Sequence, residues 1–243
     1  MIKLKENEII LFSGDSITDG GRSRNMDLNH YMGHGFPYIL SAKMSMENLS
    51  RHPKFINKGY GGEGICSIYS KWYDDVIKNK PTMINILIGV NDIFSGNAEI
   101  IPNVVRRYSE AYEMMLKDTF ELLDKPVVIL CEPFLYPAKS PQEYLKYAPH
   151  MECEKAFIPL NINLTESDWE YRMKALKDLQ KVVFELAGKY NCIFVPLQKA
   201  FEQAIGNGET EYMLWDGCHP TVAGHGLIAE QWYKCVEKEI DNM

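Results

Sequence analysis

The sequence predicts an α/β protein in which a five-stranded parallel sheet carries helices on both faces. Five short apolar runs, each of strand length, are separated by segments with helical periodicity. Parallel strands need crossover connections, and those segments are long enough to supply them. The 243 residues suit one large domain spanning 1–243 with a substantial core.

The first strand is predicted over residues 9–12 and breaks at Gly14, where a turn presents Ser16. A glycine-rich polar loop over 20–35 leads to a helix over 37–46. The second strand follows at 54–57. The segment 58–64 is too rich in glycine for a helix or a strand, and such a loop brings its backbone close to a ligand.

The second half repeats this alternation. A helix over 67–79 precedes the third strand, 83–88, which ends at Gly89-Val90-Asn91-Asp92, and a helix over 102–123 precedes the fourth strand, 126–131. Residues 135–164 carry several prolines and little periodicity, which predicts a long functional loop near the substrate. A helix over 165–189, a strand over 192–196, a helix over 198–205 and a last helix from Pro220 to residue 240 complete the chain.

Composition excludes several classes of partner. The net charge of −7, without a basic stripe, argues against nucleic acid. The chain has neither a secretory h-region nor an apolar run of 18 residues, so we expect a cytoplasmic protein without a membrane partner. Six scattered cysteines indicate reduced thiols, and no cofactor is expected. An aromatic content of 12% makes a homo-oligomer plausible.

Ser16, Gly62 and Asn91 each follow a predicted strand. Ligands of parallel sheets bind outside the carboxyl ends of the strands, so these three residues are expected at one edge. Ser16 is a candidate nucleophile there, because helical N–H groups point towards developing negative charge. The alternative is that Ser16 merely caps a helix.

A serine nucleophile needs a base, which in turn needs an orienting group. Asp216 and His219 lie three positions apart before the last helix, so Asp216 could accept the Nδ1 proton while Nε2 takes the proton of Ser16. The same spacing also fits a structural pair, with Asp216 capping a turn and His219 packing on Trp215.

An acyl transfer also needs donors for the oxyanion. The N–H of Gly62 can approach closely because the residue has no Cβ, and the Ser16 N–H and the Asn91 amide can add further donors. Taken singly, Gly62 could be a plain turn glycine and Asn91 a turn amide.

Four blocks of the sequence, in order, resemble the signature blocks of the SGNH/GDSL hydrolases: Gly14-Asp15-Ser16, Asn57 to Gly62, Gly89-Val90-Asn91-Asp92 and Asp216-Gly217-Cys218-His219. The resemblance implies a flavodoxin-like α/β/α sandwich. It also implies that Ser16 is the nucleophile, His219 the base and Asp216 its orienting acid, with Gly62 and Asn91 in the oxyanion hole. Asp216, His219 and His225 are residue types that can bind a metal ion, but no close pair of histidines or cysteines supports such a site, so no metal is expected.

Within that family, Gly14 to Asp19 and the run from His219 to His225 look most like the small intracellular acetylxylan esterases and related carbohydrate O-deacetylases. Two features depart from those esterases: Gly61 stands where they usually have serine, and the segment 135–164 is longer. Asp15, Arg22 and Trp215 are candidate substrate-binding residues, although we expect Asp15 to brace the turn rather than to react. Further aromatic residues that could stack on sugars, or simply pack in the core, are Trp72, Tyr136, Tyr144 and Tyr147.

The sequence therefore predicts a serine esterase that removes a short acyl group, most simply acetyl, from a carbohydrate through an acyl-enzyme. Two alternatives stay open. One is a lysophospholipase or thioesterase of the same fold, and the other is a catalytically silent sugar-binding protein.

Overall fold

The computed structural model describes residues 1–25, 27–94, 101–137, 166–206 and 210–240. Most of the segment 135–164, including Tyr144, Tyr147 and Cys153, lies outside these residues, so the predicted long loop is not described. The five cysteines within them are free thiols. None of the described helices combines the length and the hydropathy needed to cross a bilayer.

Five parallel strands form the sheet in the order β2-β1-β3-β4-β5. This is the flavodoxin-like order. The chain adds β2 on one side of β1 and β3 on the other, and this change of direction leaves a crevice at the carboxyl ends of β1 and β3. The strands are β1 (Ile9–Gly14), β2 (Lys54–Gly59), β3 (Met83–Leu87), β4 (Val127–Cys131) and β5 (Ile193–Val195). The prediction of a five-stranded parallel α/β fold is confirmed.

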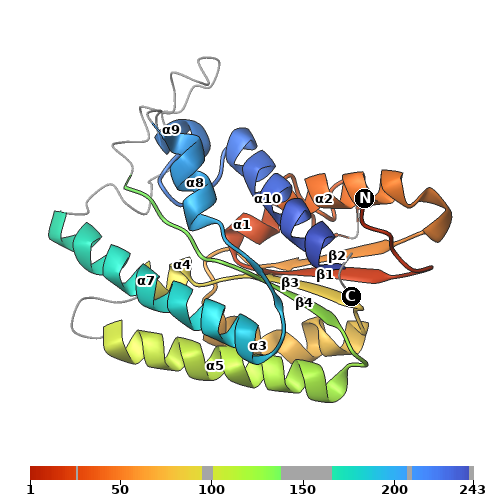
Figure 1. Ribbon diagram of the computed structural model, residues 1–243, viewed down its shortest axis with the longest axis horizontal. Helices are drawn as coiled ribbons and strands as arrows, with labels where there is room; N and C mark the ends of the chain where they lie inside the picture. The colour runs from red at the N-terminus through yellow and green to blue at the C-terminus, as the bar shows by residue number, and fades with distance from the viewer. Residues whose placement is uncertain (26, 95–100, 138–165, 207–209, 241–243) are drawn as a thin grey trace.

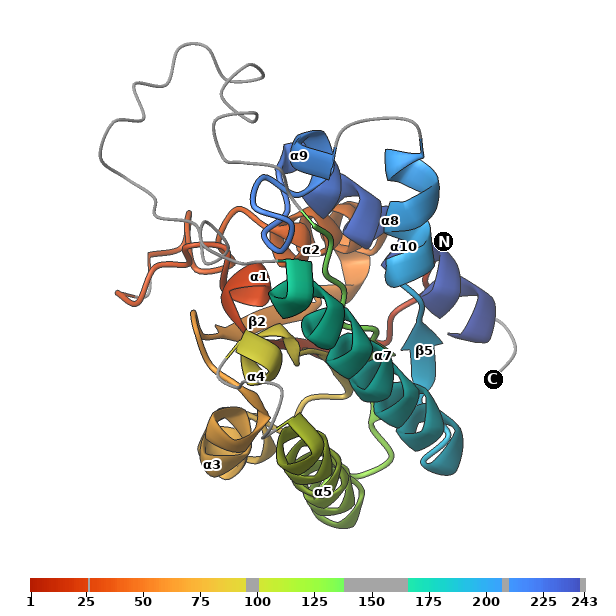
Figure 2. The ribbon, with the colours of Figure 1, turned by 90° about the vertical axis from the view of Figure 1, so that its left-hand side faces the viewer.

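Helices cover both faces of the sheet, as Figure 1 shows. One layer contains α2 (Phe36–Glu47) and α10 (Val222–Ile240), and the other contains α3 (Ile65–Asp75), α5 (Ile101–Leu122) and α7 (Glu166–Lys189). Shorter helices are α1 (Ser16–Asp19), α4 (Val90–Phe94), α8 (Gln198–Ile205) and α9 (Thr210–Met213), with 3-10 turns η1 (Leu49–Arg51) and η2 (Ile77–Asn79). Figure 2 faces the carboxyl edge of the sheet, where α1 and α4 lie near one another.

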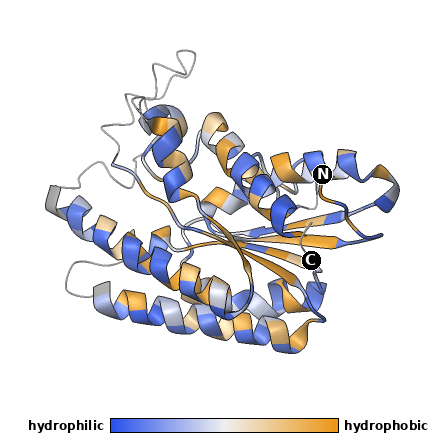
Figure 3. Ribbon diagram, in the orientation of Figure 1, coloured by the Kyte–Doolittle hydropathy of each residue, from blue (hydrophilic) through white to orange (hydrophobic). Residues whose placement is uncertain are grey.

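The core lies between the sheet and each helical layer. All five residues of β3 are buried because this central strand is covered on both faces, as its unbroken apolar sequence requires. In Figure 3 the strands are largely hydrophobic, whereas the helices carry hydrophilic residues on their outer faces. In α2, Leu40 and Met44 are buried but Tyr38 and Met46 are exposed, so only half of the apolar positions predicted for this helix face the core.

Three predicted boundaries were wrong, because tertiary contacts decide the local structure there. Lys58 and Gly59 belong to β2, since they pair with the end of β1. Helix α3 begins at residue 65 rather than 67, where a distant carboxylate caps it, and ends at residue 75. Pro220 does not start α10, because it forms a β-bridge with Leu214 and Thr221 caps the helix. The short helices α4 and α9 were not predicted.

Candidate active site

The carboxyl end of β1 places Ser16 at the start of α1. The Oδ1 atom of Asp15 accepts the N–H of Ile17 at 3.0 Å and so caps this one-turn helix. Only glycine fits at position 14, because a Cβ there would lie 2.2 Å from the carbonyl oxygen of Leu87 in the neighbouring strand. Ser16 therefore stands at a tight turn above the sheet. Its N–H belongs to the first turn of α1, where backbone N–H groups have no acceptor within the helix.

Three side chains from the two ends of the chain form a continuous hydrogen-bonded row. The Oγ atom of Ser16 lies 2.8 Å from Nε2 of His219, and Nδ1 of the same imidazole lies 2.7 Å from Oδ2 of Asp216. These distances and this order are those of a nucleophile, a general base and an orienting acid. The structure thus brings together the three residues that the sequence predicts as catalytic.

Several hydrogen bonds hold Asp216 and His219 in the turn before α10. Oδ1 of Asp216 accepts the N–H groups of Cys218 at 2.9 Å and of His219 at 2.7 Å, while Gly217 adopts a φ of +84° that closes the turn. The carbonyl oxygen of His219 accepts the N–H of Trp215 at 3.1 Å. The spacing of three residues is therefore an Asx-type turn that aims the second carboxylate oxygen at the imidazole.

Electrostatics favour proton uptake by the imidazole. Burial alone would lower the pKa of His219, but the hydrogen bond and charge of Asp216, with a contribution from Asp15, raise it above 6.5. The indole of Trp215 stacks on the imidazole with a centroid distance of 5.6 Å and an interplanar angle of 20°. The ring is thus fixed on one face by packing and on its edge by a carboxylate.

The loop after β2 supplies the candidate oxyanion donors. Gly62 has a φ of +78°, which favours glycine, and no atom lies within 4 Å of where its Cβ would be. A Cβ on Gly61 would lie 4.0 Å from the Cβ of Ser16, so this loop passes close to the candidate nucleophile. The Nδ2 atom of Asn91 donates to the carbonyl oxygen of Glu63 at 3.1 Å, which ties α4 to the loop and leaves the second amide hydrogen for a ligand.

The candidate substrate-binding residues have different places. Asp15 is 1% exposed and caps α1, so it braces the turn, and contact of Asp15 with substrate stays a prediction. Arg22 donates to the carbonyl oxygen of Gly59, and Trp215 lies beside the imidazole. Trp72 is 1% exposed and bonded to a threonine of α5, so it is a core residue and not an open sugar platform. Tyr136 is partly buried, and its hydroxyl donates to the Gln198 carbonyl oxygen.

Two residues beside the site, Asp92 and His225, hold helices in place. Both carboxylate oxygens of Asp92 accept the N–H of Ile65, and burial raises the pKa of Asp92 to about 6. Nδ1 of His225 accepts the N–H of Phe36 at 3.2 Å, so this histidine caps α2 across the layer. Its pKa is lowered to about 4 by burial and by His34 and His219. The sequence placed both within signature blocks but did not reveal their partners.

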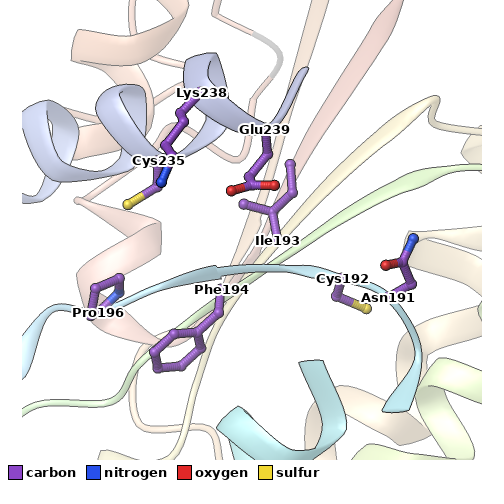
Figure 4. Close-up of a pocket in the computed structure, with 8 residues that line it drawn as sticks. All are labelled: Asn191, Cys192, Ile193, Phe194, Pro196, Cys235, Lys238 and Glu239. Atoms are coloured by element: carbon purple, nitrogen blue, oxygen red, sulfur yellow. The ribbon is translucent and has the colours of Figure 1, made fainter. Parts of the chain in front are cut away.

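Other hollows of the structure lie away from this site. The cavity in Figure 4, about 460 Å³ in volume, lies between the edge strand β5 and the end of α10 and is lined by residues such as Phe194 and Cys235. Across the described ranges, no three histidine, cysteine or carboxylate side chains gather as a metal site.

Comparison with known proteins places the chain in a family. Residues 10–232 match the model of the GDSL-like lipases and acylhydrolases, and the chain therefore belongs to that family. It is a carboxylic ester hydrolase with the α/β fold of this class.

Individual relatives agree with this assignment. The chain is 26% identical over 235 residues to an acetylxylan esterase of Geobacillus stearothermophilus, covering 96% of this chain and 95% of that one. A crystal structure described as a GDSL-like lipase from Parabacteroides merdae has a TM-score of 0.79 and 27% identity, over 97% of this chain and 98% of that chain. The acetylxylan esterase Axe2 has a TM-score of 0.74 at 24% identity, over 97% and 96% of the two chains, which shows the shared fold.

Proposed function

We propose that this protein hydrolyses short acyl esters of carbohydrates, with acetyl as the acyl group, through an acyl-enzyme on Ser16. The observation that carries the proposal is the row of hydrogen bonds from Ser16 through His219 to Asp216, at 2.8 and 2.7 Å. A sugar-binding protein has no need of a base and an acid aligned behind a serine.

In the first half of the reaction, Oγ of Ser16 attacks the ester carbonyl carbon while Nε2 of His219 takes the hydroxyl proton. The Gly62 N–H, the Ser16 N–H and the second Asn91 amide hydrogen are the donors for the resulting oxyanion. The imidazolium then gives its proton to the departing sugar oxygen, and the carbon–oxygen bond to the sugar breaks. The products are a free sugar hydroxyl and an acyl-enzyme.

In the second half, water replaces the sugar. The water oxygen attacks the acyl carbon while Nε2 of His219 takes one of the water's protons. When the second tetrahedral intermediate collapses, the imidazolium gives this proton to Oγ of Ser16. The carboxylate of Asp216 stabilises the imidazolium in both halves without taking its proton. The acyl group leaves as a carboxylic acid.

The substrate class rests on likeness to a relative. The Geobacillus stearothermophilus relative, matched over nearly the whole length of both chains, is an acetylxylan esterase, and we extend acetyl-carbohydrate chemistry to this chain on that basis. The indole of Trp215 beside the imidazole is consistent with it, because an aromatic face next to the reacting centre suits a sugar ring.

The test compares acetylated xylose oligomers with acetyl and octanoyl nitrophenyl esters, using the wild type and Ser16→Ala. Turnover of the acetyl compounds that disappears in Ser16→Ala supports the proposal. A preference for the octanoyl ester would instead indicate a lipid or thioester hydrolase, and no turnover of any ester would revive the sugar-binding alternative.

A further inference from the structure

We infer that Arg22 is a positioning residue, which holds the loop of residues 60–64 so that the Gly62 N–H faces the oxyanion. This inference rests on the proposed function, since it concerns the geometry of the same site. It replaces the expectation that Arg22 binds substrate.

The guanidinium of Arg22 is committed to the protein backbone. Its Nε and Nη2 atoms both donate to the carbonyl oxygen of Gly59, at 3.2 and 3.1 Å, and its side chain is only 11% exposed. Nε also lies 3.4 Å from a carboxylate oxygen of Asp19, at the end of α1. Arg22 therefore links the helix that begins with the nucleophile to the residue where the oxyanion loop begins.

The same guanidinium packs on the first side chain of that loop. Its central carbon lies 5.1 Å from the ring centroid of Tyr60, a cation–π distance. The Tyr60 N–H donates to the carbonyl oxygen of Gly14 at 2.9 Å, and the Tyr60 hydroxyl donates to Asp75 at 2.8 Å. Arg22 thus completes the fixing of Tyr60, whose backbone leads directly into Gly61 and Gly62.

The far end of the loop is held by other residues. Asp92 accepts the N–H of Ile65, Asn91 donates to the carbonyl oxygen of Glu63, and Lys71 pairs with the Glu63 carboxylate at 2.7 Å. Gly61 and Gly62, in the middle, have no side chains with which to hold themselves. The direction of the Gly62 N–H therefore depends on the anchors at both ends, and Arg22 is one of those at the start.

The chemistry of this anchor requires arginine. A guanidinium presents its donors in a rigid planar fork and stacks flat on an aromatic ring, whereas the ammonium of lysine is a point charge on a flexible stem. Arg22→Lys keeps the positive charge but loses the two-donor bond to Gly59 and the guanidinium that packs against Tyr60. Arg24→Lys is the matched control. Arg24 lies on the same loop, pairs with the same Asp19 and has its guanidinium carbon 5.7 Å from the Tyr60 ring centroid, but only Arg22 donates to Gly59.

The experiment measures kcat and KM on an acetyl nitrophenyl ester, together with the rate at which a fluorophosphonate labels Ser16. We expect Arg22→Lys to lower kcat and the labelling rate about 10- to 100-fold, because a misplaced donor stabilises the transition state poorly. KM is expected to stay within about two-fold of the wild type, and Arg24→Lys to change each quantity less than about three-fold. Tyr60→Leu, which removes the stacked ring, provides the same comparison should Arg22→Lys lower the melting temperature strongly.

Two results would overturn the inference. If Arg22→Lys raised KM and left kcat unchanged, Arg22 would be a substrate contact. If Arg22→Lys and Arg24→Lys had equal effects, Arg22 would not position the loop. Failure of the proposed function would look different, because the wild type itself would then show no turnover that depends on Ser16.

Discussion

Replacing Asp216 by asparagine tests how the acid sets the state of the base. The side chain is 1% exposed, and its two oxygens have separate partners: Oδ1 accepts two backbone N–H groups and Oδ2 accepts the Nδ1 proton of His219. In Asp216→Asn, the amide oxygen can keep the two backbone bonds only if the NH₂ group faces Nδ1. Because that group is a donor, the imidazole must then carry its proton on Nε2.

This tautomer cannot accept the proton of Ser16. We therefore expect kcat to fall about 1,000- to 10,000-fold, which corresponds to about 4 to 5.5 kcal/mol of transition-state stabilisation. The loss should be smaller than that of His219→Ala, which removes the base itself. The melting temperature should change little, since the substitution is isosteric and the turn keeps its two backbone hydrogen bonds.

The assay is steady-state turnover of an acetyl nitrophenyl ester, alongside a thermal melt of each variant. Histidine ¹⁵N NMR reports the tautomer directly. It should show the imidazole proton on Nδ1 in the wild type and on Nε2 in Asp216→Asn. A folded Asp216→Asn protein that retains more than about a tenth of the wild-type kcat would refute the reasoning.

Three other predictions follow from the same contacts. Because the pKa of His219 is raised above 6.5 and the base must be neutral to act, kcat/KM should fall as the pH drops through that raised pKa; an activity that stays flat down to pH 5 would contradict this. Gly14→Ala should destabilise the fold by about 1 to 3 kcal/mol or more in urea unfolding, whereas Gly61→Ala, with only the Ser16 Cβ 4.0 Å away, should stay within about 1 kcal/mol of the wild type. His225→Phe leaves the buried N–H of Phe36 without an acceptor and should cost about 1 to 3 kcal/mol of unfolding free energy, and an unchanged urea midpoint would argue against the cap.

The fold could be predicted because its signals are local. The inner strands β1, β3 and β4 are apolar runs that are almost wholly buried. Parallel strands joined by helices then leave few arrangements. Helix boundaries failed where a distant group decides them. The start of α3 depends on the Asp92 carboxylate, 27 positions away, and the start of α10 depends on the bridge between Leu214 and Pro220.

The candidate catalytic residues could be predicted because each follows a strand or precedes a helix at the same edge of the sheet. The roles of their neighbours could not, since a side chain's partner is a tertiary fact. Arg22 has the charge of a substrate ligand, but its Nε and Nη2 atoms both donate to Gly59. Asp15 has the chemistry of a reactive carboxylate, but it is buried as a helix cap.

Turnover by Ser16→Ala tests the central claim most directly. The substitution removes one hydroxyl group, which leaves the Asp15 cap of α1 and the turn before α10 intact. The account predicts that hydrolysis of an acetyl nitrophenyl ester falls by at least about 10,000-fold while the melting temperature is preserved. Wild-type turnover in a correctly folded Ser16→Ala protein would show that the row of Ser16, His219 and Asp216 is not the catalytic machinery.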